Sequence, residues 1–209
     1  MDYESMIMKA KKIYNDDQTG HDFSHIQRVV DFCKIIHEKE GGNWDVIFIS
    51  ALFHDVHRIL SNKENKYMTP EECMDTVKDI LSEFVIEKDL LNKVFYVIEQ
   101  HDNKKGDSSV MLELQIVQDA DLLDSIGQMG LDRTIRYCKN KNIPLYNKDY
   151  PLDYEKYVPN TNPVSATHYV YRTMIPKIKL LNTKTAKDMA NPEIDVLKKF
   201  IDENVGGKI

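Results

Sequence analysis

Cysteine is scarce in this sequence, and the three cysteines stand far apart. Cys33, Cys73 and Cys138 form no CxxC pair. Closely spaced cysteines are typical of disulfide frameworks and of cysteine-rich zinc sites. The sequence therefore argues against both kinds of site, and a reducing cytoplasm is the compartment that we expect.

Long apolar runs are absent as well. No stretch approaches 18 consecutive apolar residues, which is about the shortest length that a membrane-spanning helix needs. The N-terminal sequence MDYESMIMKAKK has acidic residues early and lacks the apolar core of a signal peptide. We therefore expect neither a membrane segment nor a secretory leader.

Positive charge is in deficit, because 28 lysines and arginines face 34 aspartates and glutamates, giving a net charge of -6. Binders of nucleic acid polymers or of anionic membranes usually carry a basic surface, so we expect neither partner. A small anionic substrate remains compatible, since a bound metal ion dominates the field in its own site. The oligomeric state is left open by the sequence.

Apolar residues at helical spacing are what the sequence has in abundance, and strand-like alternation of useful length is missing. We therefore predict an all-α protein with a single domain over residues 1–209, which is long enough to bury a core. Its core is expected over about 19–140, with C-terminal helices over about 163–204 packed on it. Helices are predicted over about 3–15, 22–40, 44–60, 69–84, 88–100, 110–126, 131–139, 164–181 and 185–204, the last two interrupted near Pro176 and Pro192. Residues 61–68 and 141–162 are expected as loops.

The segment FISALFHDVHRIL, residues 48–60, reads as a helix with almost no polar face, so it should be buried on most sides. It carries His54 and Asp55, and burying an imidazole beside a carboxylate is costly unless something pairs with both. A divalent cation would do so. The alternative is a His-Asp pair at the exposed end of the helix.

Two further helices carry polar groups beside apolar residues, namely His25 in HDFSHIQRVV and Asp121 in QDADLLDSIG. Together with His54 and Asp55 they would form a set of two imidazoles and two carboxylates. This set suits Mn²⁺, Fe²⁺, Co²⁺, Ni²⁺ or Zn²⁺ better than Ca²⁺, with Mg²⁺ as a further candidate. Bringing the four side chains together requires a helix bundle whose inner faces meet.

The order H…HD…D resembles the HD-domain superfamily of metal-dependent phosphohydrolases. The segments GHDFSHIQRVVDFC, ALFHDV, QDADLLDSIGQMGLDRT and THYVYRTMIPKIKLLNTKTAKDMA look like a small bacterial branch of it, and the resemblance spans about residues 19–190. It implies an all-α HD-domain bundle with a metal site between helices. It implies metal binding by His25, His54, Asp55 and Asp121. It also implies hydrolysis of a phosphate ester or anhydride, mostly of nucleotides, through a metal-activated water in which Asp55 takes part.

Several nearby residues are candidates for holding the phosphorylated substrate. Arg28 follows His25 by three residues on the same helix face, with a salt bridge to a neighbouring helix as the alternative. His21 lies at the helix start, where anions are favoured, although it could equally be a solvated loop histidine. His101, Lys104 and Lys105 could bind phosphate or belong to a charged, solvated loop.

Asp124 shares the helix face of Asp121 and could orient a ligand histidine, or it could pair with Arg133 or Arg28. The catalytic base is unassigned, because several relatives carry an acid soon after the HD pair whereas HDVHRIL has none until Glu64. His57 and Glu64 are the candidates for this role. The missing acid also favours the alternative function, a non-catalytic metal-containing nucleotide-binding or regulatory module.

Overall fold

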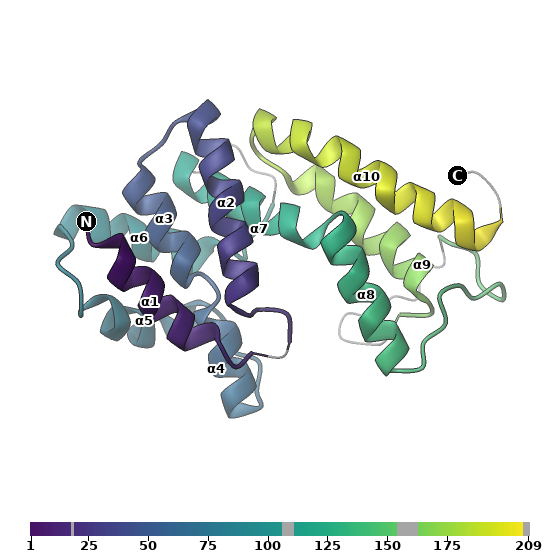
Figure 1. The fold of residues 1–209 in the computed structure, drawn as a ribbon, viewed down its shortest axis with the longest axis horizontal. Helices are drawn as coiled ribbons and strands as arrows, with labels where there is room; N and C mark the ends of the chain where they lie inside the picture. The colour runs from purple at the N-terminus through teal and green to yellow at the C-terminus, as the bar shows by residue number, and fades with distance from the viewer. Residues whose placement is uncertain (18, 106–110, 154–162, 207–209) are drawn as a thin grey trace. The chain divides into compact units, whose positions relative to one another are not determined.

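The computed structural model describes residues 1–17, 19–105, 111–153 and 163–206 (Figure 1). All regular structure in these ranges is helical, which confirms the predicted all-α class. The elements are α1 (Tyr3–Tyr14), α2 (Phe23–Glu40), α3 (Trp44–Phe53), α4 (Val56–Glu64), η1 (Glu71–Cys73), α5 (Met74–Leu81), α6 (Lys88–Gln100), α7 (Leu112–Ser125), α8 (Gln128–Asn140), α9 (Ala166–Tyr169), η2 (Val170–Met174), η3 (Ile175–Leu180) and α10 (Lys184–Val205).

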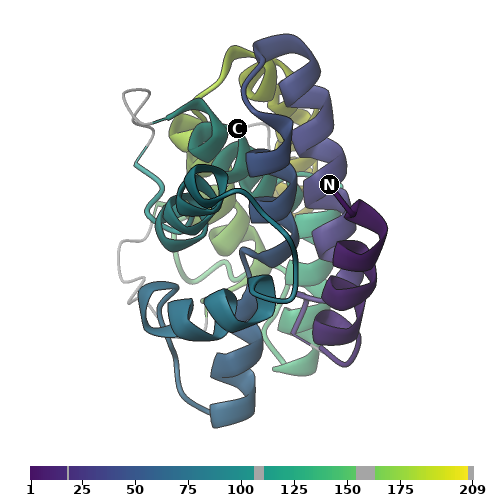
Figure 2. The ribbon, with the colours of Figure 1, turned by 90° about the vertical axis from the view of Figure 1, so that its left-hand side faces the viewer.

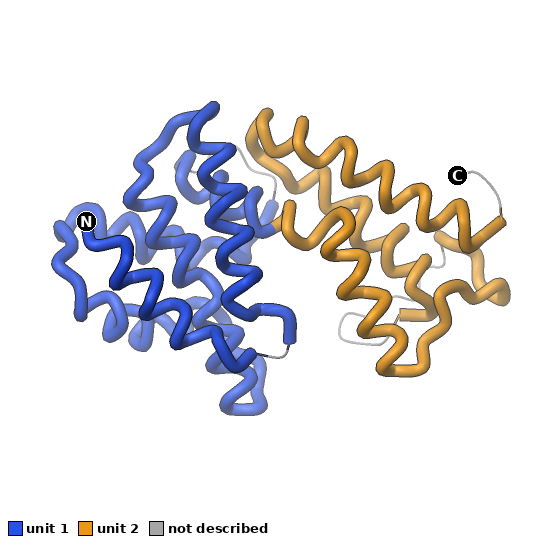
Figure 3. Tube along the Cα trace, in the orientation of Figure 1, with its two compact units in different colours: residues 1–121 blue, residues 122–209 orange. Residues whose placement is uncertain are grey.

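The chain divides into two compact units, unit 1 over residues 1–121 and unit 2 over residues 122–209 (Figure 3). Each unit has buried apolar residues of its own. The predicted single domain over residues 1–209, with its core over about 19–140, stays a prediction.

Helix α3 is the central element of unit 1. Every residue from Val46 to Phe53 is buried, and the helix packs against α1, α2 and α6 (Figure 2). A helix without a polar face has to be covered on several sides, and the surrounding helices provide that cover. The helix that the sequence predicted to be buried is therefore the one around which unit 1 is built.

Side-chain caps fix where two of the predicted helices begin. Asp22 precedes α2 and its carboxylate accepts a hydrogen bond from the backbone N–H of His25, which holds His25 in the first turn. At the start of η1, Thr69 and Glu72 each accept a hydrogen bond from the other's backbone N–H, at 3.3 Å and 2.8 Å. This reciprocal pair is a capping box.

The predicted helix over residues 44–60 is wrong in one respect, because the structure breaks it into α3 and α4. Helix α3 ends at Phe53 and α4 begins at Val56, so His54 and Asp55 form the link, with Asp55 at φ -94° and ψ 14°. Apolar residues continue through the break and therefore hide it in the sequence. Helix α4 also runs on to Glu64, so residues 61–64 are helical and not part of a loop.

Unit 2 has a separate core, whose buried residues are Leu131, Cys138, Ala166, Val170, Met174, Leu197, Phe200 and Ile201. Pro192 was predicted to interrupt the last helix, but α10 continues through it. Proline removes one backbone N–H and its bond to the carbonyl four residues earlier, which belongs to Asp188. Both residues are exposed, so water can satisfy that carbonyl. Between residues 166 and 180 the backbone instead passes from α through π to 3₁₀ geometry.

Cys33, Cys73 and Cys138 are free and buried. Within the residues that the structure describes, no helix has both the length and the apolar character required to cross a bilayer.

Candidate metal centre

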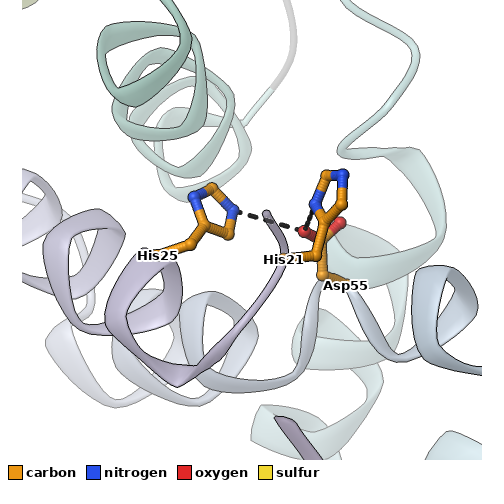
Figure 4. Close-up of side chains that lie close together, drawn as sticks. All are labelled: His21, His25 and Asp55. Carbon is orange, nitrogen blue, oxygen red and sulfur yellow. Dashed lines mark hydrogen bonds and ion pairs between the residues drawn. The ribbon is translucent and has the colours of Figure 1, made fainter. Parts of the chain in front are cut away.

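Asp55 lies in unit 1 at the centre of a group of imidazoles. Its Oδ2 is 2.6 Å from Nδ1 of His21 and 3.2 Å from Nε2 of His25, and both rings face the carboxylate in Figure 4. Nε2 of His54 lies 3.5 Å from the same oxygen. The side chains of His25, His54 and Asp55 are buried, whereas that of His21 is 33% exposed. The helix break after Phe53 thus places the predicted His-Asp pair against the start of α2.

Asp121 of α7 adds a second carboxylate to this group. Its Oδ1 lies 3.5 Å from Nε2 of His25 and 3.9 Å from Nε2 of His54. The structure therefore brings together the four residues that the sequence singled out as metal ligands, and His25, His54 and Asp121 offer ligand atoms close enough to share one ion.

The hydrogen bonding of His54 fixes which of its nitrogens can bind a metal. Nδ1 lies 2.8 Å from the carbonyl oxygen of Ala51, which can only accept, so Nδ1 carries the proton. A neutral ring then presents the lone pair of Nε2, which has no hydrogen-bond partner among the described residues. Burial lowers the pKa of His54 in spite of the two nearby carboxylates, so the neutral form is favoured. A lone pair aimed at carboxylates is repulsive unless a cation lies between them.

The distances in the group also fit a shared cation. Metal bonds of 2.0–2.2 Å place neighbouring ligand atoms about 3.0 Å apart at a right angle and about 3.4 Å apart at a tetrahedral angle. The separations between imidazole nitrogens and carboxylate oxygens are 3.2, 3.5, 3.5 and 3.9 Å. The residues present therefore fit a divalent metal ion.

Both carboxylates are held in their charged form. Burial alone would raise the pKa of Asp55, but hydrogen bonds with His21 and His25 help to outweigh it, and the pKa lies well below its usual range. Burial opposes ionisation of Asp121 as well, and the Lys104 ammonium outweighs it and lowers the pKa of Asp121. A metal ion would therefore find both ligands already deprotonated near neutral pH.

Comparison with known proteins identifies the fold. The HD domain family matches residues 22–126, which is half of the chain and includes all four of these residues. The chain belongs to the HD domain family. The resemblance inferred from H…HD…D is thereby confirmed.

Two bacterial proteins are similar to this HD domain protein over most of their length. An HD-superfamily hydrolase from Bacillus thuringiensis superposes with a TM-score of 0.75 at 29% identity, covering 97% of this chain and 94% of that one. The uncharacterized protein YpgQ of Bacillus subtilis is 25% identical over 196 residues, which are 92% of this chain and 86% of YpgQ. A structure of YpgQ in complex with ADP superposes with a TM-score of 0.71 at 24% identity, covering 97% and 93% of the two chains. The fold is that of HD-superfamily hydrolases.

A second His-Asp group lies beside the HD pair. Nε2 of His57 is 3.2 Å from Oδ2 of Asp102, and Nε2 of His101 is 3.7 Å from Oδ1 of Asp102 and 3.9 Å from Oδ1 of Asp55. His101 is fully buried, so its assignment to a solvated loop is wrong. Its possible role in phosphate binding stays a prediction.

Asp102 was not assigned a role from the sequence, although a signal was present. His101-Asp102 is a third His-Asp dipeptide besides His21-Asp22 and His54-Asp55, and like His54-Asp55 it directly follows the last residue of a helix, here Gln100 of α6. His101 still has helical backbone angles, with φ -60° and ψ -33°, and Asp102 lies 3.2 Å from His57 of α4.

Two cations of unit 1 lie among these carboxylates. Lys104 Nζ is 2.7 Å from Asp121 and 3.3 Å from Asp102, while Arg58 Nη2 is 2.8 Å from Asp102. Burial disfavours the charge on Lys104, yet Asp121 and Asp102 outweigh burial and raise its pKa. We assigned no role to Arg58 from the sequence, because its partner Asp102 lies 44 residues further along the chain. Lys105, by contrast, is exposed.

The other sequence candidates lie as follows. Arg28 is half-buried and donates a hydrogen bond to Ser24 at 3.1 Å. Glu64 is exposed at the end of α4 and is not in any of the candidate metal-binding groups of the described residues. In unit 2, Asp124 forms the ion pair with Arg133 that was its alternative assignment, at 3.2 Å. The proposed functional roles of all three stay predictions.

A pocket of about 450 Å³ opens beside the metal centre within unit 1. Its lining consists of Thr19, His21, Arg58, Ser61, Asn62, Asn65, Lys66 and Tyr67. None of these residues is acidic, although the whole sequence carries a net charge of -6. His21 and Arg58 both approach Asp55, at 2.6 Å and 3.8 Å, and so connect the pocket with the metal centre.

Proposed function

We propose that this HD domain protein is a metal-dependent phosphohydrolase that acts on a nucleotide or on another small phosphorylated metabolite. The observation that carries the proposal is the convergence of His25, His54, Asp55 and Asp121, with the lone pair of His54 Nε2 aimed at two carboxylates. Such a set of side chains fits a cation and has no other evident use in a buried position.

The ligand set of two imidazoles and two carboxylates suits Mn²⁺, Fe²⁺, Co²⁺, Ni²⁺ or Zn²⁺, with Mg²⁺ as a further candidate. When bound, such an ion lowers the pKa of a water molecule and polarises a phosphoryl oxygen. The backbone carbonyl of Ala51 keeps His54 in the tautomer that can bind it. His25 and the ionised carboxylates complete the site.

His21 is well placed to act on the substrate. Its Nδ1 lies 2.6 Å from Oδ2 of Asp55, and its ring lines the pocket. We infer that Asp55 orients the ring so that Nε2 can transfer a proton or donate a hydrogen bond to a phosphoryl oxygen. His57 and Glu64 remain the candidates named by the sequence, with His57 buried against Asp102 and Glu64 exposed.

The pocket supports a phosphorylated substrate. Arg58 and Lys66 provide positive charge in its lining, while Ser61, Asn62 and Asn65 provide neutral polar groups that can hydrogen-bond a sugar or a base. The volume of about 450 Å³ falls in the usual range for a small-molecule site. YpgQ, whose fold is shared, has been crystallised with ADP. We therefore propose a nucleotide as the substrate.

The test is release of phosphate or pyrophosphate from a panel of nucleoside mono-, di- and triphosphates in the presence of Mn²⁺ or Co²⁺. We expect release that stops on addition of a chelator and returns when the metal is restored. The absence of release from every nucleotide and from a generic phosphomonoester would overturn the proposal.

The alternative is a non-catalytic metal-containing nucleotide-binding or regulatory module. The sequence HDVHRIL favours it, because Glu64, the first acid after the HD pair, is exposed and is not in the candidate metal-binding groups of the described residues. Tight nucleotide binding without turnover in the same panel would support the module over the enzyme.

A further inference from the structure

A carboxylate that does not line the pocket binds three of the residues that do. Oδ2 of Asp17 accepts hydrogen bonds from the backbone N–H groups of Thr19 and His21, both at 2.8 Å. The Thr19 hydroxyl donates to the same carboxylate at 2.9 Å, and Nδ2 of Asn62 donates to Oδ1 at 2.8 Å. Thr19, His21 and Asn62 belong to the pocket lining. Asp17 therefore organises part of the pocket wall from outside it.

These hydrogen bonds fix the backbone between α1 and α2. Thr19 and His21 lie outside both helices, so helical hydrogen bonding does not provide acceptors for their N–H groups. Asp17 replaces those acceptors, and hydrogen bonds to an ionised carboxylate are stronger than those between neutral groups. Its own backbone N–H donates to the carbonyl of Tyr14, the last residue of α1, at 3.3 Å. The position of the His21 backbone is thereby tied to the end of α1.

Asn62 joins the same segment to α4. A carboxylate can only accept, so the amide nitrogen of Asn62 must face Asp17. This nitrogen also lies 3.2 Å from the hydroxyl of Thr19. Arg58, another residue of the pocket lining, precedes Asn62 by four residues and lies on the same face of α4. The contact thus sets the segment that carries His21 against the helix that carries Arg58.

His21 is consequently held at two points by two different carboxylates. Asp17 binds its backbone N–H at 2.8 Å, and Oδ2 of Asp55 lies 2.6 Å from Nδ1 of its ring. The side chain is 33% exposed and lines the pocket, so the ring is accessible from there. A contact at the ring alone would leave the backbone free to shift, and a displacement of about 1 Å at a reacting group is enough to cost about 100-fold in rate.

We propose that Asp17 is a positioning residue, which holds the backbone of His21 so that its ring stays between Asp55 and the bound substrate. The inference rests on the proposed function, because it requires that His21 acts on a phosphoryl group. Asp17 itself does not contact the substrate, and its effect passes through His21.

The first test is steady-state phosphate release by Asp17→Ala. We expect kcat to fall by about 10- to 100-fold with unchanged metal content, because His21 is displaced while His25, His54 and Asp121 are not. Asp17→Asn should lose less, since its amide oxygen still accepts from the N–H groups of Thr19 and His21. Asp16→Ala is the matched control, because Asp16 is an exposed neighbour whose carboxylate contacts Asn15 at 3.4 Å. This control should keep the wild-type kcat.

A double-mutant cycle separates positioning from a general loss of structure. In a chain that already carries His21→Ala, adding Asp17→Ala should not lower kcat further, because the residue through which Asp17 acts is gone. A purely structural role of Asp17 would lower kcat by the same factor in both backgrounds. Circular dichroism of each variant checks that the helices are intact.

The second test does not depend on turnover. Amide hydrogen exchange of Thr19 and His21 is measured by nuclear magnetic resonance on the full chain without added metal. Loss of the carboxylate acceptor in Asp17→Ala should speed exchange at both amides by about 10-fold. Asp16→Ala should leave both rates unchanged.

Unchanged exchange at His21 in Asp17→Ala would overturn the proposal, as would equal losses of kcat in the two backgrounds of the cycle. Either result, combined with phosphate release by the wild type, leaves the proposed function standing. Absence of release by the wild type, together with faster exchange at His21 in Asp17→Ala alone, would instead overturn the function and support the contact between Asp17 and His21.

Discussion

Nδ1 of His21 lies 2.6 Å from Oδ2 of Asp55, so the segment before α2 is joined to the link between α3 and α4. The sequence left open whether His21 is a solvated loop histidine, and the structure shows a loop residue that is 33% exposed and paired with Asp55. The same oxygen of Asp55 lies near His25 and His54. Asp55 is thus the residue on which most of the proposed chemistry depends.

Replacing Asp55 with alanine should abolish phosphate release and weaken metal retention while leaving the helical content largely unchanged. Loss of a residue that orients a metal ligand typically costs about 10- to 100-fold, so loss of a ligand should cost more than about 100-fold. Phosphate release, metal content after gel filtration and circular dichroism are the measurements. Asp75→Ala is the control, and normal turnover in Asp55→Ala would remove the ligand assignment.

Lys66 should contribute to substrate binding and not to metal binding. It lines the pocket at an exposed position, so Lys66→Ala should raise KM by about 10-fold with little change in kcat or metal content. Lys63→Ala removes an exposed lysine of α4 that is not in the lining, and steady-state kinetics of both variants give the comparison. Equal KM values for Lys66→Ala and wild type would show that Lys66 does not contact the phosphates of the substrate.

The hydrogen bond that Tyr3 donates to Asp45 should make stability depend on pH in the alkaline range. Burial, followed by the Asp45 carboxylate, raises the pKa of Tyr3 to about 12 from an ordinary value of 10.0. Because the folded-state pKa is raised, this stabilisation is complete below about pH 10 and is lost as the pH rises toward about 12. Urea unfolding at several pH values should show that the free energy of unfolding falls more steeply with rising pH for wild type than for Tyr3→Phe. Equal slopes for the two proteins would contradict the link between the raised pKa of Tyr3 and stability.

Gly130 should not tolerate a side chain. A Cβ there would lie 2.1 Å from the carbonyl oxygen of Ser125 and 3.0 Å from Met174 Cε. The backbone would have to move, so Gly130→Ala should lower the free energy of unfolding of the protein by about 1–3 kcal/mol. Met129→Ala, at a neighbouring side chain that is 45% exposed, is the control. The midpoint of thermal unfolding is measured for both variants. An unchanged midpoint for Gly130→Ala would show that the backbone between Ser125 and Gly130 can move at little cost.

Local patterns predicted much of the fold. Helices α1, α2 and α6 lie close to their predicted bounds, because apolar periodicity and clear end signals agree there, such as the Asp22 cap. The break at His54 and Asp55 escaped prediction because apolar residues on both sides continue the helical pattern. At Pro192 the error was the opposite, because a break was predicted and the helix continues. Pro192 is exposed in α10, so water can replace the lost backbone hydrogen bond.

The candidate site divides in the same way. His25, His54, Asp55 and Asp121 could be chosen from the sequence because they form an ordered motif in an apolar setting. Arg58 and Asp102 could not be paired in advance, because their 2.8 Å contact joins α4 to the end of α6 and depends on how the two elements pack. Contacts between elements that are distant along the chain cannot be predicted from the spacing of residues within one segment.

The carbonyl oxygens of Ala51, His54 and Ile98 accept hydrogen bonds from Nδ1 of His54, His57 and His101, so the backbone helps to fix the orientation of three histidine rings. Substitutions elsewhere on the surface therefore leave these rings aimed as they are, provided that the helix ends stay folded. The arrangement should persist when the ion is exchanged, so a single preparation could be reloaded with one metal after another and compared directly.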